Sequence, residues 1–77
     1  MLDNRLTECV ARAFKLNPSM VTRETAPANT PTWDSISHLN LIFEVEDVFG
    51  VRLSTEEIPR VTSAGSLEEI LRTRKAL

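Results

Sequence analysis

Residues 34–50 of the chain read DSISHLNLIFEVEDVFG, a strongly helical segment. Apolar side chains recur in it every three to four residues, which is the period of an α-helix. Asp34 is a good N-cap residue, and Gly50 suits the left-handed position that follows many helix ends. The sequence therefore predicts a helix from Ser35 to about Phe49.

The sequence before this segment predicts a first helix and a long connection. Apolar residues at helical spacing, with Leu6 and Phe14 among them, predict a helix from about Asp3 to Lys15 that Asn17-Pro18 brings to an end. Residues 16–33 then hold three prolines and keep no period. Connections of this length are uncommon in compact domains and are often functional.

Two capping boxes follow. The run Ser54-Thr55-Glu56-Glu57 predicts a brief helix that Pro59 limits, and Ser66-Leu67-Glu68-Glu69 predicts the start of the last helix, with Ser63 as a competing start. No alternating strand pattern of useful length occurs. We therefore expect an all-α fold, a small four-helix bundle in one domain over residues 1–77.

The composition is that of an ordinary small soluble domain. Of 77 residues, 42% are hydrophobic and 26% are charged. The single cysteine excludes an intramolecular disulfide, and no apolar run approaches the length that spans a membrane. No signal-peptide pattern opens the chain. We expect a cytoplasmic monomer that does not interact with membranes.

Charge is distributed unevenly along the chain. Residues 34–57 contain six acidic residues and one basic residue, a net charge of −5, whereas the remainder carries +3. The negative charge of residues 34–57 argues against a nucleic-acid partner, because phosphate contacts need clustered Lys and Arg. It favours protein partners with basic patches, unless the acidic residues are only a solvated face.

The predicted helix at residues 35–49 has apolar side chains on two sides. One side forms a core stripe made of Leu41, Val45 and Phe49, flanked by Ile42 and Val48. The other side carries Ile36, Leu39 and Phe43, which we call the second stripe, bordered by Asn40, Glu44 and Asp47. A bundle this small can hardly bury both sides, so the second stripe predicts a docking surface. The alternatives are burial under residues 16–33 or a homodimer interface.

Ser35 lies where the loop becomes helix. Its primary alcohol falls in the first turn, where backbone N–H groups are unpaired and the helix dipole is positive. A phosphate ester on this oxygen would be stabilised there.

These features together resemble the acyl and peptidyl carrier protein family across nearly the whole chain. The resemblance rests on Asp34-Ser35-Ile36, the apolar pattern that follows, and Glu46-Asp47-Val48-Phe49-Gly50-Val51. Leu53, the Glu56-Glu57 region and the Thr62-Ser63 turn continue it. It implies a bundle of three main helices and one short one, with a long loop between the first two.

The resemblance also implies a function. A phosphopantetheinyl transferase would use magnesium and coenzyme A to attach phosphopantetheine covalently to Ser35, with Asp34 supporting the transfer. The arm would hold an acyl or aminoacyl group as a thioester. The partners implied are this transferase, an acyl- or aminoacyl-loading ligase, and downstream transferases or synthases. The partner-binding residues would be Ile36, Leu39, Phe43, Glu44, Glu46 and Asp47.

Two departures indicate a discrete carrier of a specialised biosynthetic pathway. Trp33 precedes Asp34 where many fatty-acid carriers have Gly, and Ile36 replaces the usual Leu. The alternative function is a helical interaction module that docks through the second stripe and is never modified.

Enzyme and metal functions are not predicted. His38 lies one helical turn after Ser35, but no third group completes a catalytic arrangement, so we predict no catalytic residues and a structural histidine turned toward the core. One Cys and one His do not make a metal site. We expect Cys9 to be part-buried, and Trp33 to anchor the loop with its indole N–H partly solvated.

Overall fold

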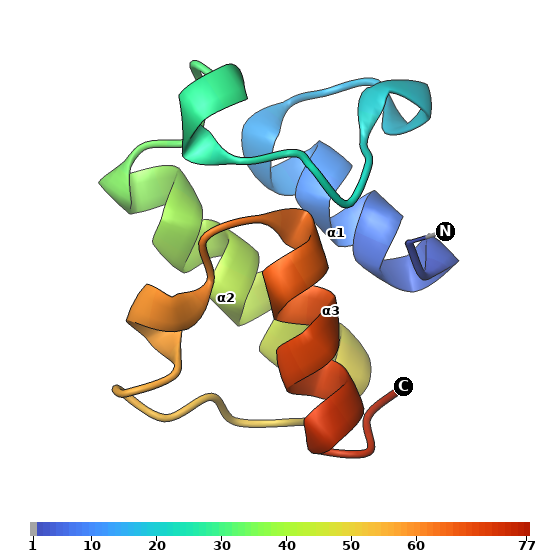
Figure 1. Ribbon diagram of the computed structural model, residues 1–77, viewed down its shortest axis with the longest axis vertical. Helices are drawn as coiled ribbons and strands as arrows, with labels where there is room; N and C mark the ends of the chain where they lie inside the picture. Colours follow the sequence, from blue (N-terminus) through green and yellow to red (C-terminus); the bar gives the residue numbers. More distant parts are fainter. Residues whose placement is uncertain (1) are drawn as a thin grey trace.

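The computed structural model describes residues 2–77, which fold into three α-helices with three short 3₁₀ helices in the connections (Figure 1). No strand occurs among these residues, so the predicted all-α class is confirmed. In chain order the elements are α1 (Asn4–Phe14), η1 (Pro18–Met20), η2 (Pro27–Asn29), α2 (Ser35–Phe49), η3 (Ile58–Arg60) and α3 (Ala64–Thr73).

The ends of α1 and α2 follow from their capping residues. The Asp3 carboxylate accepts the N–H groups of Arg5 and Leu6 at 2.9 and 3.2 Å, and Lys15 ends α1 in the left-handed conformation. Asp34 accepts the N–H of Ser37 at 2.8 Å, and Gly50 ends α2 with φ +66°. A residue without a Cβ suits that last conformation. The predicted bounds of α2 are therefore confirmed.

One apolar core lies between the three α-helices. Its fully buried side chains are Leu6, Cys9, Val10 and Phe14 from α1, Leu41, Ile42 and Val45 from α2, and Leu67 and Leu71 from α3. Cys9 is 0% exposed, so the expectation of a part-buried thiol was wrong. Burial raises the pKa of the Cys9 thiol above its ordinary value.

Of the two predicted starts of the last helix, Ser66 was wrong and the competing start, Ser63, is confirmed. Ser63, not Ser66, caps α3, and the two serines form a reciprocal capping box with N–H to Oγ distances of 3.0 Å both ways. Ser66 is thus the third residue of the helix. The first N–H groups of α3 are also satisfied from the long connection, because Gly65 donates to the Arg23 carbonyl at 2.9 Å.

The box at residues 54–57 forms, but no α-helix follows it. The Ser54 N–H donates to Glu57 at 2.9 Å, and the Glu57 N–H donates to Ser54 Oγ at 3.2 Å. Pro59 has no N–H with which to continue an α-helical ladder, so the segment becomes a turn followed by η3. The short helix is therefore a 3₁₀ helix that begins four residues later than the box.

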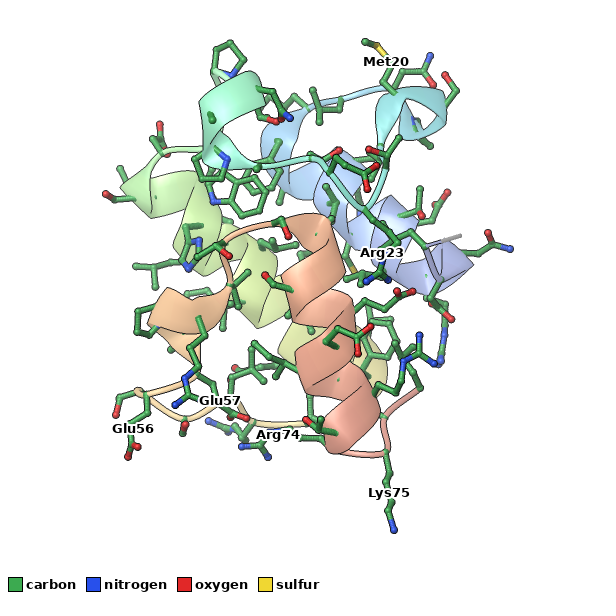
Figure 2. All side chains as sticks on the ribbon, viewed as in Figure 1. Met20, Arg23, Glu56, Glu57, Arg74 and Lys75 are labelled. Atoms are coloured by element: carbon green, nitrogen blue, oxygen red, sulfur yellow. The ribbon has the colours of Figure 1, made fainter. Side chains whose placement is uncertain are left out.

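An ion pair fixes this turn against the end of α3. Figure 2 shows the Glu57 and Arg74 side chains meeting at the lower end of the bundle. The Arg74 guanidinium donates to the carboxylate and lowers the pKa of Glu57 to about 2.

A buried carboxylate ties the long connection to the bundle. Glu68 on α3 is only 2% exposed; its Oε2 accepts the Asp3 N–H at 2.9 Å, and its Oε1 pairs with Arg23. Arg72 lies 3.6 Å from the same oxygen. The connection crosses the upper end of the bundle in Figure 1, so the exposed side of α2 is left uncovered.

Candidate functional site

Ser35 is the first residue of α2 and its side chain is exposed. Among residues 2–77, no hydrogen bond involves its hydroxyl. The neighbouring Asp34 keeps Oδ1 on the Ser37 N–H, and this bond lowers the pKa of Asp34. The site therefore presents an unbonded alcohol beside a carboxylate that is ionised at neutral pH, at the positive end of a helix.

Trp33, the residue before Asp34, packs the start of α2 against α1. The Trp33 ring stacks on Phe14 with centroids 4.4 Å apart, and Trp33 is 7% exposed. Its Nε1–H donates to His38 Nδ1 at 3.0 Å, so the prediction of a partly solvated indole N–H was wrong. Its role as an anchor of the loop agrees with the prediction.

His38 is half-buried and uses both ring nitrogens. Nδ1 accepts from the indole, which is only a donor, so Nε2 carries the proton and donates to the Ile58 carbonyl at 3.0 Å. An imidazole occupied in this way is no general base for Ser35. Sequence reasoning missed the hydrogen bond between Trp33 and His38. Their positions could have indicated a contact, because the residue before an N-cap often packs against the fourth residue of the helix, as in a hydrophobic staple.

An open groove of about 620 Å³ adjoins Ser35. It lies between η2, the first turns of α2 and the link before α3. Apolar atoms dominate its lining, which consists of Pro27, Trp33, Asp34, Ser35, His38, Leu39, Val61 and Thr62.

The second stripe is open to solvent. Ile36 is 73% exposed, Leu39 46% and Phe43 62%, so burial under residues 16–33 is excluded. On the core side, Leu41, Ile42 and Val45 are buried as predicted. Phe49 is half-buried beneath Arg5, 4.6 Å from its ring, and Val48 is 36% exposed. The prediction of Val48 as a core flank was wrong, because the buried arc of α2 centres near Leu41 and Ile42 and leaves Val48 at its rim.

The three carboxylates predicted for partner binding lie in different surroundings. Glu44 pairs with Arg12 at 3.0 Å, and Glu46 accepts the Leu53 N–H at 2.9 Å. Asp47 is exposed and forms no ion pair within residues 2–77. Two of the three acidic groups are therefore already engaged inside the fold.

The part of the chain that the structure describes contains no cluster of three or more His, Cys, Asp or Glu residues that could hold a metal ion. Over the same residues, no helix combines the length and the apolar character needed to cross a bilayer.

Comparison with known proteins identifies similar carriers. No family model matches the chain. An acyl carrier protein from Lactobacillus johnsonii is 19% identical over 72 residues, which are 94% of this chain and 90% of that protein. The solution structure of a holo acyl carrier protein from Geobacter metallireducens superposes with a TM-score of 0.80 at 28% identity, over 92% of this chain and 82% of that one. These matches confirm the predicted resemblance to acyl carrier proteins and the predicted fold.

Proposed function

We propose that this chain is an acyl carrier protein that holds an acyl or aminoacyl group on a phosphopantetheine arm attached to Ser35 Oγ. The observation that carries this proposal is the exposed, unbonded Ser35 hydroxyl at the N-terminus of α2. The similarity to acyl carrier proteins over nearly the whole chain supports it.

The residues around Ser35 fit such an arm. The helix N-terminus favours the negative phosphate diester, and the adjoining groove offers apolar contact to the chain beyond it. When bound, phosphopantetheine supplies a terminal thiol that holds the acyl group as a thioester. In this proposal the reactions of the thioester take place in partner enzymes.

Asp34 has a second role in this proposal. Its Oδ1 is occupied by the Ser37 N–H, whereas Oδ2 makes no hydrogen bond among residues 2–77. This ionised oxygen is available to the magnesium ion and the serine hydroxyl when a phosphopantetheinyl transferase binds. Asp34 thus supports the transfer while it caps α2.

The second stripe is the docking face in this proposal. Ile36, Leu39 and Phe43 continue directly from Ser35 along α2, and Asp47 provides a free charge at the far end. The partners are the transferase, an acyl- or aminoacyl-loading ligase, and downstream transferases or synthases. Trp33 in place of a small residue favours a specialised pathway.

The test is an intact mass after incubation with coenzyme A, magnesium and a broad-specificity phosphopantetheinyl transferase. We expect the wild type to gain the mass of one phosphopantetheine and Ser35→Ala to gain none. Because the Ser35 side chain is exposed and unbonded, the variant should keep the wild-type circular dichroism spectrum.

A folded wild-type chain that gains no mass, beside a reference carrier that does, would refute the proposal. The exposed second stripe would then favour an unmodified interaction module.

A further inference from the structure

A second groove, of about 430 Å³, lies between the end of α1 and the middle of α2, and we call it the α1–α2 groove. It shares no lining residue with the groove beside Ser35. The two helices that form it pack side by side (Figure 1). Its lining includes Arg12, Ala13 and Lys15 on the α1 wall and Phe43, Glu44 and Asp47 on the α2 wall. Because Phe43 also belongs to the second stripe, the groove continues the proposed docking face onto α1.

Two charged groups of this groove are already paired with each other. The Arg12 guanidinium lies 3.0 Å from the Glu44 carboxylate on the opposite wall and 3.9 Å from the Glu8 carboxylate on α1. Carboxylates of the fold therefore compensate the positive charge of Arg12. Glu44 is in turn occupied, so neither group is available as the main charge contact of a partner.

Lys15 and Asp47 are the charged side chains of the groove that stay available. Both are exposed, and neither forms an ion pair or a side-chain hydrogen bond within residues 2–77. Lys15 lies on the α1 wall and Asp47 on the α2 wall, and the Phe43 ring, 62% exposed, lies in the same lining. The groove thus combines an exposed aromatic ring with opposite charges on its two walls.

This combination suits a protein partner. Protein interfaces have an apolar centre and a polar rim, and complementary charges across the rim select the partner. A wholly basic partner would attract Asp47 but repel Lys15, and a wholly acidic one would do the reverse. A groove between two helices also fits a third helix that packs along it.

We propose that the α1–α2 groove binds a helix of a partner protein, with an apolar ridge over Phe43, a carboxylate facing Lys15 and a cation facing Asp47. The inference rests on the docking face of the proposed function and names the chemistry of its partner. The charge of residues 34–57 by itself favours a basic partner. Lys15 adds the requirement for an acidic group on one flank of the partner helix.

Three stapled helical peptides with the same apolar ridge test this preference. The mixed peptide carries Glu on one flank and Lys on the other, and the two single-sign peptides carry Lys on both flanks or Glu on both. Each is titrated at low salt into the isotope-labelled, unmodified chain, and backbone amide shifts are followed. We expect the mixed peptide to shift Ala13, Lys15 and Phe43 and to bind roughly three- to fivefold more tightly than either single-sign peptide, as expected for one exposed ion pair.

Lys15→Gly removes the charge of the α1 wall without harming the fold. Lys15 ends α1 with φ +57°, a conformation that glycine adopts freely, so the thermal midpoint should be unchanged or higher. In this variant the mixed peptide should lose its advantage over the all-Lys peptide. Lys75→Gly is the matched control, because it removes the same charge at φ +58° from a side chain that points away from the bundle (Figure 2). It should keep the wild-type preference.

Equal affinity of the wild type for the mixed and all-Lys peptides would overturn the inference. An effect of Lys15→Gly that Lys75→Gly reproduces would also overturn it, because the preference would then follow net charge and not the groove. Shifts confined to Ile36 and Leu39 would place the peptide on the second stripe alone and would contradict the role of α1.

The proposed function is decided separately by the mass gain at Ser35. A chain that gains phosphopantetheine but shows no preference among the peptides refutes this inference alone. A chain that prefers the mixed peptide but gains no mass refutes the carrier proposal, and the α1–α2 groove is then the binding site of an unmodified interaction module.

Discussion

Asp34 caps α2, and in the proposed function the same carboxylate also supports the transfer to Ser35. Its hydrogen bond from the Ser37 N–H begins α2, and its charge lies next to the Ser35 hydroxyl. Since that bond lowers the pKa of Asp34 in the folded state, its contribution to stability is complete above the ordinary pKa and is lost as the pH falls through the lowered one.

Two substitutions separate these tasks. Asn caps a helix about as well as Asp, so Asp34→Asn should keep the thermal midpoint of the wild type, whereas Asp34→Ala should lower it. Both variants lack the charge, so both should slow the modification of Ser35, measured as the initial rate of mass gain. An Asp34→Asn chain modified at the wild-type rate would contradict the role assigned to the charge.

The two ends of α2 could be predicted from the sequence, whereas the hydrogen bond between Trp33 and His38 could not. Asp34 and Gly50 mark the ends of α2 because capping depends on neighbours within one turn. The bond from Trp33 to His38 also spans one turn, but it requires a particular ring orientation that residue types do not specify. The attachment role of Ser35 and the partner roles of the stripe residues stay predictions.

Helix α2 has one apolar side in the core and another that faces solvent. Leu41 and Val45 are fully buried, while Ile36 and Phe43 on the opposite side are mostly exposed. Exposed apolar side chains in a row carry little folding energy, so the row is available for binding.

Phe43→Ala tests this division. Phe43 is 62% exposed, so the free energy of unfolding should change by no more than about 0.5 kcal/mol. The kcat/KM of the transferase for this chain should fall. Met20→Ala is the matched control, because Met20 is 70% exposed on η1, at the top of the molecule in Figure 2, and is not part of α2, so it should leave kcat/KM unchanged.

A large drop in stability for Phe43→Ala would assign the side chain to the core instead. Glu46 is a poorer probe of docking, because its carboxylate holds the Leu53 N–H and a substitution there disturbs the link after α2. Asp47 has no such bond.

At the level of elements, periodicity predicted the helices and capping boxes predicted turns. The Ser54–Glu57 box formed without an α-helix because Pro59 removes the next donor. For α3, two serines one turn apart offered equivalent starts, and docking of the long connection onto residues 64 and 65 selected the earlier one. Sequence spacing alone holds no information on that contact.

Glu68 joins three distant parts of the molecule. The carboxylate is almost completely buried. It accepts the Asp3 N–H near the start of the chain and pairs with Arg23 of the long connection. Arg72, on α3 itself, lies farther away, at 3.6 Å. A buried charge of this kind depends on its partners, because an uncompensated one is strongly destabilising.

Arg23→Ala should therefore destabilise the whole fold. It removes the main countercharge of the buried Glu68, and we expect a loss of about 3 kcal/mol in the free energy of unfolding, measured with urea. Arg72→Ala is the control, since its exposed guanidinium lies 3.6 Å from the same carboxylate and should contribute less than about 1 kcal/mol. Equal losses from the two variants would contradict the anchoring role of Arg23.

Nothing in the sequence pattern predicted this anchor. The pattern places Glu68 only in a capping box, and Arg23 lies 45 residues earlier in a segment without a period. Pairing at that separation depends on the assembled bundle. The three main helices could therefore be predicted from the sequence, whereas the ion pair that joins the connection to α3 could not.

Complete burial of Cys9 has a consequence for the acyl group of the proposed function. Thioesters exchange readily with an accessible thiolate, and disulfides form between exposed thiols. The only sulfhydryl of this chain is enclosed by the core, and burial raises the pKa of Cys9, which disfavours the thiolate. If Ser35 carries the proposed arm, the Cys9 thiol cannot take the acyl group from it, and Cys9 cannot form a disulfide with a second copy while the core stays closed.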